Sequence, residues 1–270
     1  MTGKRGAQPV YSDVALETAL SLRLLFRLPL RQTEGFLHAL LTLMGVDLPC
    51  PDHTTLSRRH ATVAIRRQIN QAPDGAISLI VDSSGLKVCG QGEWHVQKHG
   101  EKTGKRWKKL HIGVDAQGQI VASMVTDSHA PDPSQVPALL SQVNHRIDRF
   151  IGDGMYDKEP VYAAVMQHSP GARVIIPPRK DAVVSPTVAT APTQRDLHVL
   201  AIESAGRLPW KRMSGYYAQS HAENVFSRYK RTFGGELRAK EASQEREAAL
   251  ACALLNRMRE FGRPQSYLVS

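Results

Sequence analysis

The sequence of 270 residues contains only three cysteines, and they lie far apart. Cys50, Cys89 and Cys252 form no Cys-x-x-Cys pair, so the pattern indicates neither a structural zinc site nor a disulfide framework. Sparse, unpaired cysteine is typical of proteins in a reducing compartment, and we expect a cytoplasmic protein.

Long hydrophobic runs are also missing from the sequence. No apolar stretch reaches the roughly 18 residues that a membrane-spanning helix needs, and the longest candidate, Leu37 to Met44, is interrupted by His38 and Thr42. The basic N-terminus is not followed by an apolar run, so no signal peptide is predicted. With 41% hydrophobic and 22% charged residues, the composition favours a globular protein with one large domain, or a small domain joined to a large one.

Negative charge is in deficit. The chain carries 35 Lys and Arg residues against 25 Asp and Glu residues, which gives a formal net charge of +10. Clustered basic side chains gain binding free energy when they displace counterions from phosphates. This balance therefore favours a polyanionic partner such as DNA.

Residues 1–73 predict an all-helical head. Ser12 and Asp52 are suited to be N-caps, and three helices are expected at about 12–29, 30–45 and 54–68. The third helix carries Arg58 and Arg59, and three short helices that end in a basic one suggest a DNA-binding helix-turn-helix. A plain helical subdomain with a solvated basic face is the alternative.

Residues 74–270 predict a mixed core. Short β-branched runs predict strands over 77–81, 110–114, 120–125, 149–152 and 172–176. Asp115 to Gly118 predicts a hairpin turn between the second and third strands. Helices are expected over 133–147, 158–168, 216–231 and 243–261, and a loop insertion is expected over 177–210. This order predicts an α/β fold in which helices pack on a mixed sheet.

Two aspartates follow apolar runs at predicted strand ends. Asp82 ends Ile77-Ser-Leu-Ile-Val-Asp82, and Asp153 ends Phe150-Ile-Gly-Asp153. An Asx turn explains either aspartate taken alone. Because neighbouring strands bring their ends to one edge of a sheet, the pair also fits two metal ions roughly 4 Å apart.

A third carboxylate, Glu223, lies in a helical pattern. Tyr216, Gln219 and Lys230 stand seven before, four before and seven after it, so all four side chains share one helix face. A glutamate on a core-facing helix needs a partner, either a metal ion or an arginine in a salt bridge. Oxygen donors that repel one another suit hard divalent cations, so the three carboxylates together predict metal-assisted phosphoryl transfer.

A basic segment with interleaved tryptophans lies between the first two predicted strands. Residues 94–111 contain one glutamate and six basic residues, among them Lys105, Arg106, Lys108 and Lys109. Such a segment can follow a phosphate backbone, while a solvated hairpin is the alternative. No cysteine or acidic pattern accompanies its three histidines, so we interpret them as polar loop residues: His95, His99 and His111.

These motifs occur together in a known family. The pattern Tyr216-x2-Gln219-x3-Glu223-x6-Lys230 resembles the Tyr-x2-Arg-x3-Glu-x6-Lys signature of bacterial insertion-sequence transposases. The chain resembles a DDE transposase of the insertion-sequence-five family from about residue 8 to the C-terminus. The other motifs that carry the resemblance are Cys50-Pro-Asp-His53, Ser57-Arg-Arg59, Val81-Asp82, Trp107-Lys-Lys-Leu-His111 and Gly152-Asp153-Gly-Met-Tyr-Asp157.

The resemblance implies an RNase H-like core that binds transposon ends, nicks them with metal-activated water and joins the freed 3′-hydroxyl to target DNA. Asp82, Asp153 and Glu223 would hold two Mg²⁺ ions, with Mn²⁺ as a substitute. The side chains at 216, 219 and 230 would lie beside the terminal phosphates, and a homodimer on DNA is expected. Gln219 departs from the family's arginine, and its amide cannot make the charge-assisted bidentate contact of a guanidinium.

Two other functions fit the same sequence. A related metal-dependent nuclease or resolvase would cut DNA without joining it. An inactive DNA-binding relic of a transposase would keep the basic surfaces without using the acids. A strand-transfer assay with a pre-cleaved end separates the first from a transposase, and an Asp-to-Asn substitution separates the second.

Overall fold

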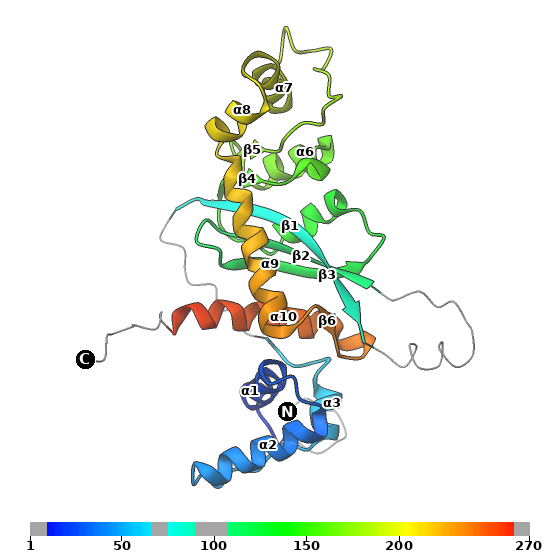
Figure 1. Ribbon diagram of the computed structural model, residues 1–270, viewed down its shortest axis with the longest axis vertical. Helices are drawn as coiled ribbons and strands as arrows, with labels where there is room; N and C mark the ends of the chain where they lie inside the picture. The colour runs from blue at the N-terminus through cyan, green and yellow to red at the C-terminus, as the bar shows by residue number, and fades with distance from the viewer. Residues whose placement is uncertain (1–9, 66–74, 90–106, 262–270) are drawn as a thin grey trace, which may run out of the picture.

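A computed structural model describes residues 10–65, 75–89 and 107–261 of the protein (Figure 1). A mixed sheet lies at the centre, helices cover both of its faces, and a helical head lies at one end. Among the helices of the described ranges, none is long and apolar enough to cross a membrane.

The head contains the three expected helices, which are α1 (Asp13–Leu25), α2 (Leu30–Leu43) and α3 (His53–Arg59). The two expected N-caps are confirmed: Ser12 Oγ accepts from Ala15 N at 3.2 Å, and Asp52 Oδ1 accepts from Thr55 N at 2.6 Å. The third helix was predicted too long. It ends at Arg59, and the chain then turns so that Val63 is fully buried in the core.

The sheet has the strand order β3-β2-β1-β4-β5. β1, β2 and β3 are antiparallel neighbours, whereas β4 and β5 continue the sheet in parallel with β1, so the predicted mixed sheet is confirmed. A short sixth strand pairs in parallel with the end of β1. The strands are β1 (Ile77–Val88), β2 (Trp107–Val114), β3 (Ile120–Asp127), β4 (Ile147–Ile151), β5 (Arg173–Ile175) and β6 (Glu236–Leu237).

The predicted hairpin turn joins β2 and β3. Gly118 N donates to Asp115 O at 2.9 Å, and the Asp115 carboxylate accepts from the backbone of Gln117 and Gln119. Gly118 has a φ of +73°, which glycine adopts without the steric cost that a Cβ would bring.

The remaining elements are η1 (Asp132–Gln135), α5 (Val136–Leu140), η2 (Gly154–Tyr156), α6 (Glu159–His168), α7 (Gln194–Ala205), α8 (Arg207–Ser214), η3 (Tyr216–Gln219), α9 (Ser220–Phe233) and α10 (Glu241–Glu260).

Three helix predictions need correction. The helix expected over 133–147 ends at Leu140, and β4 already begins at Ile147. The loop expected over 177–210 is irregular only in its first part, because a Thr193–Asp196 capping box starts α7. The helix expected over 216–231 begins as a 3₁₀ turn, so Tyr216 and Gln219 precede α9.

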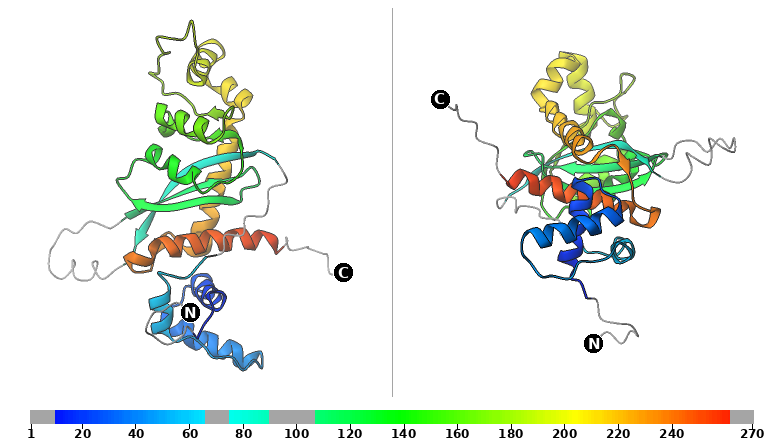
Figure 2. Two further views of the ribbon diagram at one scale, coloured as in Figure 1. Left: turned by 180° about the vertical axis from the view of Figure 1, so that it is seen from behind. Right: turned by 60° about the horizontal axis from the view of Figure 1, so that its bottom comes forward.

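Helices lie on both faces of the sheet (Figure 2). Buried side chains form one hydrophobic core on each face. Side chains alternate along a strand, so Ile80 and Leu86 of β1 point to one face and Leu79 and Val81 to the other. The first face packs against α9 and α10, which in turn contact α1, and the second face packs against α5 and α6. This alternation places Asp82 on the face that α9 covers.

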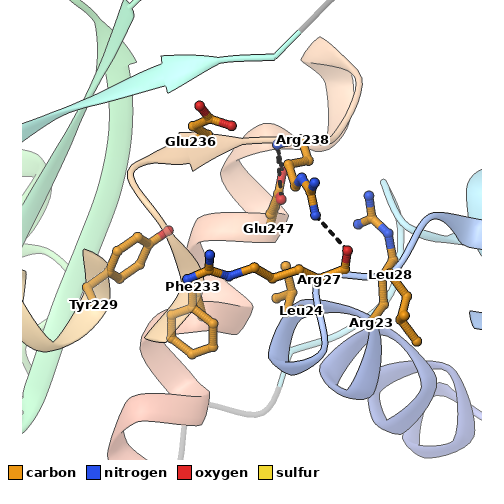
Figure 3. A pocket seen from close by; sticks show the side chains of 10 residues that line it. Arg23, Leu24, Arg27, Leu28, Tyr229, Phe233, Glu236, Arg238 and Glu247 are labelled. Carbon is orange, nitrogen blue, oxygen red and sulfur yellow. Dashed lines mark hydrogen bonds between the residues drawn. The ribbon is translucent and has the colours of Figure 1, made fainter. Parts of the chain in front are cut away.

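The head is docked on the core through Arg27, which follows α1 with a φ of +53° (Figure 3). Its Nη2 donates to Arg231 O at 3.3 Å and to Thr232 O at 3.4 Å, both at the end of α9. In return, Arg238 Nη1 donates to Arg27 O at 2.7 Å. The carboxylate of Glu247 accepts from the backbone N of Arg238, which holds this junction to α10.

Candidate active site

Asp82 lies in the middle of β1 and not at a strand end, because β1 continues to Val88. The apolar run stops at Asp82, but the extended backbone continues in register with β2, where Asp82 faces Ile112. Asp82 Oδ1 accepts from Ser83 N at 2.8 Å. The prediction that a strand stops here was wrong. The residues after Val81 are mostly less buried, so the sequence becomes more polar, but their backbone still pairs with β2.

Asp153 follows β4 as predicted and lies level with Asp82. Ile80 of β1 pairs with Ile151 of β4 in parallel, so two residues further on the two aspartates come to the same height. Asp153 is the N-cap of η2, and its Oδ1 accepts from Met155 N at 2.8 Å. The chain can turn here because Gly152 lacks a Cβ, which would lie 3.1 Å from the Tyr156 ring.

Glu223 lies in the first turn of α9, the helix that crosses the Asp82 face of β1. It is exposed, whereas Val225 and Phe226 of the same helix are buried. The expectation of a core-facing glutamate was therefore wrong. Glu223 stands at the border of the packed face, where it can reach a ligand without the cost of burying a charge.

The charges of Asp153 and Glu223 both act on Asp82. The pKa of Asp82 is raised to about 6, first by burial and then by the charges of Asp153 and Glu223, against the lowering effect of the Ser83 hydrogen bond. Burial also raises the pKa of Asp153. The pKa of the Tyr216 phenol is raised by burial and then by the charges of the same three carboxylates. The negative charges of the three carboxylates therefore act on the same region, between Asp82 and Tyr216.

The donor set fits a hard divalent cation, because partly buried carboxylates that repel one another are stabilised by a neutralising ion. Within the described ranges, however, no group of three His, Cys, Asp or Glu side chains is close enough to hold one metal ion. Asp82, Asp153 and Glu223 are thus close enough for their charges to interact but too far apart to coordinate one ion together. Their side chains would have to move to bind a metal.

Gln219 is buried, with only 5% of its surface exposed. Its Nε2 donates to Val81 O at 3.1 Å, and its Oε1 has no hydrogen-bond partner among the described residues. The helix-face argument predicted a side chain beside DNA, but the 3₁₀ turn directs it to the backbone of β1. Its contact with DNA stays a prediction.

Lys230 and Tyr216 lie on either side of Glu223. Lys230 is exposed, and its Nζ donates to Ser84 Oγ at 2.7 Å, two residues after Asp82 on β1. Tyr216 is partly buried, and Lys211 Nζ lies 5.1 Å from the centre of its ring. Cations therefore stand at both ends of the acidic site.

Sequence reasoning missed a fourth carboxylate, Asp132. It follows β3 at the start of η1, and its charge raises the pKa of both Asp82 and Asp153. Lys109 Nζ donates to it at 2.8 Å, which partly neutralises this charge. The signal that identified Asp153 is absent here, because Asp132 lies five residues beyond the end of β3 and not directly after an apolar run.

Several predicted DNA-binding cations are held by carboxylates. Arg59 pairs with Asp13 at 2.7 Å, and Lys108 pairs with Asp127 at 2.7 Å. Lys109 is bound to Asp132, as described above. Arg58 lies in the last turn of α3, whereas Lys105 and Arg106 lie outside the described residues. These residues stay predicted DNA contacts, and the paired ones would have to exchange a partner to bind phosphate.

The interpretation of His111 as a loop residue was wrong. It lies in β2 opposite Ser83 and is fully buried, with Nε2 2.8 Å from Thr126 Oγ1. His95 and His99 lie outside the described residues.

A groove of about 460 Å³ extends the site along β1. Lys87 and Gly85 form one wall, the Lys230 end of α9 forms another, and Arg27 reaches in from the head. Trp107, which begins β2, is 43% exposed and packs beside Gly85. Sequence reasoning did not find this groove, because its cations come from three separate parts of the chain.

The mixed sheet, with acids on β1, after β4 and on α9, fits an RNase H-like core. Comparison with family models agrees with this class. A model described as Transposase DDE domain matches residues 74–257, and a second model with the same description matches residues 1–91.

The first match covers more than half of the chain, and the chain belongs to the DDE transposase family. It is a metal-dependent enzyme of DNA cleavage and transfer, and DNA is its partner.

Proposed function

We propose that the protein is an insertion-sequence-five transposase, which binds the ends of its element, cleaves them and joins them to target DNA. Asp82, Asp153 and Glu223 are the proposed catalytic residues and would hold two Mg²⁺ ions. The observation that carries the proposal is the placement of these carboxylates, which lie 70 to 141 positions apart in the sequence. The parallel register of β1 and β4 sets Asp82 level with Asp153, and the charges of Asp153 and Glu223 both raise the pKa of Asp82.

Each acid has a distinct structural role in this proposal. Asp82 is fixed by β1 and by its bond to Ser83 N, and Asp153 is oriented by its N-cap bond to Met155 N. Glu223 is exposed on α9 and has the most freedom to approach them. When bound, the metal ions would activate the attacking oxygen and stabilise the leaving oxygen of the phosphodiester.

The groove beside β1 has four cationic side chains against one acid, Glu236, and it gives the DNA strand a path away from the three carboxylates. From Asp82 to Lys87 the strand advances about 16 Å, at roughly 3.3 Å per residue. Lys230 stands between them, and it would meet a phosphate next to the scissile one. Arg27 and Lys87 would meet phosphates further along the same strand.

Two further parts of the proposal concern assembly. The basic end of α3 in the head would read or position the DNA as a helix-turn-helix, with Arg58 and Arg59 as contacts. The protein would act on paired element ends as a homodimer. Domain limits of 1–73 for the head and 74–270 for the catalytic domain complete the proposal.

The decisive experiment offers the full chain a radiolabelled DNA end, intact or pre-cleaved, together with a target plasmid and Mg²⁺. Wild-type protein should nick the intact end and join the pre-cleaved one. Asp82→Asn, Asp153→Asn and Glu223→Gln should each lose at least 10³-fold in both reactions, an order of magnitude in keeping with the loss of a group that stabilises transition-state charge.

The matched control is Asp181→Asn, which removes an exposed carboxylate paired with Arg179 in the irregular segment before α7. It should cleave and join like wild type. Cleavage without a joined product would replace the transposase with a nuclease. Unchanged cleavage in the three acid variants would reject the catalytic assignment.

A further inference from the structure

A second basic groove, of about 470 Å³, lies on the other side of α9. The hairpin turn at Gln117 forms its floor, Asn224 and Arg228 of α9 form one wall, and Arg259 near the end of α10 forms the other. No aspartate or glutamate is among the described residues that line it. The guanidinium groups of Arg228 and Arg259 thus line the same groove, and no carboxylate among its described lining residues neutralises them.

The two arginines are held in place by the fold. Arg228 Nη2 donates to Leu255 O at 3.4 Å, which ties it to α10. Arg259 Nη1 packs against the hairpin turn, only 3.1 Å from the point where a Cβ on Gly118 would stand. A side chain at residue 118 would therefore displace Arg259, and the glycine keeps the space for it.

The two positive charges oppose each other. Burial lowers the pKa of Arg228, and the charge of Arg259 lowers it further. A protein gains nothing in stability from placing two cations together, whereas an anion between them would remove the repulsion. Guanidinium groups suit phosphate in particular, because their N–H groups match its oxygens in a bidentate contact.

The position of the groove on α9 relates it to the catalytic face. Lys230 and Glu223 are seven residues apart and share one side of the helix. Arg228 is two residues before Lys230, so it projects about 160° away from it around the helix axis. An α-helix is only 10–12 Å across with its side chains, and DNA phosphates recur every 3.4 Å along each strand. DNA that reaches Glu223 therefore carries phosphates past both sides of α9.

We propose that Arg228 and Arg259 form a second phosphate site, which binds the DNA backbone across α9 from the catalytic carboxylates. Asn224 and Gln117 border the site and supply amide donors. The proposal rests on the proposed function only in taking DNA as the ligand. It assigns to α9 contacts with DNA on two sides, with Glu223 and Lys230 on one side and Arg228 on the other.

The test uses the full chain and a fluorescent duplex oligonucleotide without metal, with affinity measured by anisotropy over a series of NaCl concentrations. Arg259→Gln should weaken binding at low salt and lower the slope of log K against log[salt] by about 0.9, the value for one phosphate contact on B-DNA. The control Arg179→Gln makes the same charge change outside both grooves and should keep the wild-type slope. An equal slope in the two variants would overturn the proposal.

A second measurement separates a ligand site from a structural role. Without an anion, Arg259→Gln should raise the Tm, because it removes the repulsion on Arg228. Inorganic phosphate should raise the Tm of wild type more than that of the variant, compared with chloride at equal ionic strength. A Tm that falls on substitution would show that Arg259 stabilises the fold, and it would reject the phosphate site.

Failure of this proposal differs from failure of the proposed function. If Asp82→Asn cleaves DNA like wild type while the Arg259→Gln slope falls, the catalytic assignment fails and the phosphate site stands. If Asp82→Asn is inactive while Arg259→Gln binds with the salt slope of the control, the phosphate site fails and the catalytic assignment stands.

Discussion

Gln219 donates a hydrogen bond from its Nε2 to the carbonyl of Val81 at 3.1 Å, and this bond joins the start of the α9 region to β1 one residue before Asp82. The amide is buried, so the bond is protected from water. In this protein the residue at the family's arginine position therefore supports the scaffold of the acidic site.

Gln219→Ala should destabilise the protein by about 1–3 kcal/mol, since it removes a buried hydrogen bond and leaves a void. Gln219→Met should cost less, because it fills the volume and also removes the Oε1 that has no partner among the described residues. Urea unfolding followed by circular dichroism measures both free energies. Equal stability of Gln219→Ala and wild type would mean that the bond adds nothing.

Divalent metal should stabilise the folded protein. Mg²⁺ that binds the native carboxylates but not the unfolded chain adds about 2.7 kcal/mol at a concentration 100 times its dissociation constant. Differential scanning fluorimetry should show a Tm that rises with Mg²⁺ and returns with EDTA. In Asp82→Asn the rise should be much smaller, and in Asp181→Asn it should match wild type. An identical rise in all three proteins would place the ion elsewhere.

The head should lose stability in mild acid through His60. Its ring is 5% exposed, and burial together with the charge of Arg23 lowers its pKa to about 4, against an ordinary value of about 6.5. Between these values the unfolded state binds more protons than the folded state, so the free energy of unfolding falls as the pH drops from 6.5 to 4. The full loss is about 3 kcal/mol.

Urea unfolding at pH 7.5 and pH 4.5 tests this effect. His60→Asn should show a smaller loss between the two pH values than wild type. His38→Asn, which replaces an exposed histidine of α2, should lose as much as wild type. An undiminished loss in His60→Asn would assign the acid sensitivity to other groups.

Two substitutions of Arg27 should separate the effect of its left-handed backbone on stability from the effect of its side-chain hydrogen bonds. Arg27→Ala loses the guanidinium bonds to the end of α9 and keeps a Cβ at a φ of +53°. Arg27→Gly loses the same bonds but relieves the strain of the left-handed backbone, so it should be about 1 kcal/mol more stable than Arg27→Ala. Thermal unfolding of the two variants measures the difference. A glycine variant that is less stable than the alanine variant would contradict the strain.

The local parts of the fold were predictable from the sequence. The side chains of Ser12 and Asp52 cap helices by accepting hydrogen bonds from residues three positions later. The hairpin turn depends on the positive φ of Gly118. Local chemistry determines these features.

The features that were missed depend on distant partners. α7 was predicted as part of a loop because residues 177–210 are rich in Pro, Thr, Ala and Arg and show no clear hydrophobic period. In the structure its leucines, Leu197 and Leu200, are exposed. Gln219 was placed beside DNA because a helical wheel does not show the 3₁₀ turn or the carbonyl of Val81. The cations of Arg27 and Lys87 meet only after the head docks on the sheet.

β1 holds α9 at both ends. Gln219 bonds to Val81 just before α9, and β6 pairs with Lys87 and Val88 just after it. Helix α9 and strand β1 are therefore connected on both sides of the span from Asp82 to Ser84, and they form a closed frame. The backbone of Glu223 cannot move away from Asp82 while both connections hold. Any movement of α9 away from β1 would break the Gln219–Val81 bond or the β1–β6 pairing, so we expect a conformational change on DNA binding in the elements outside this frame.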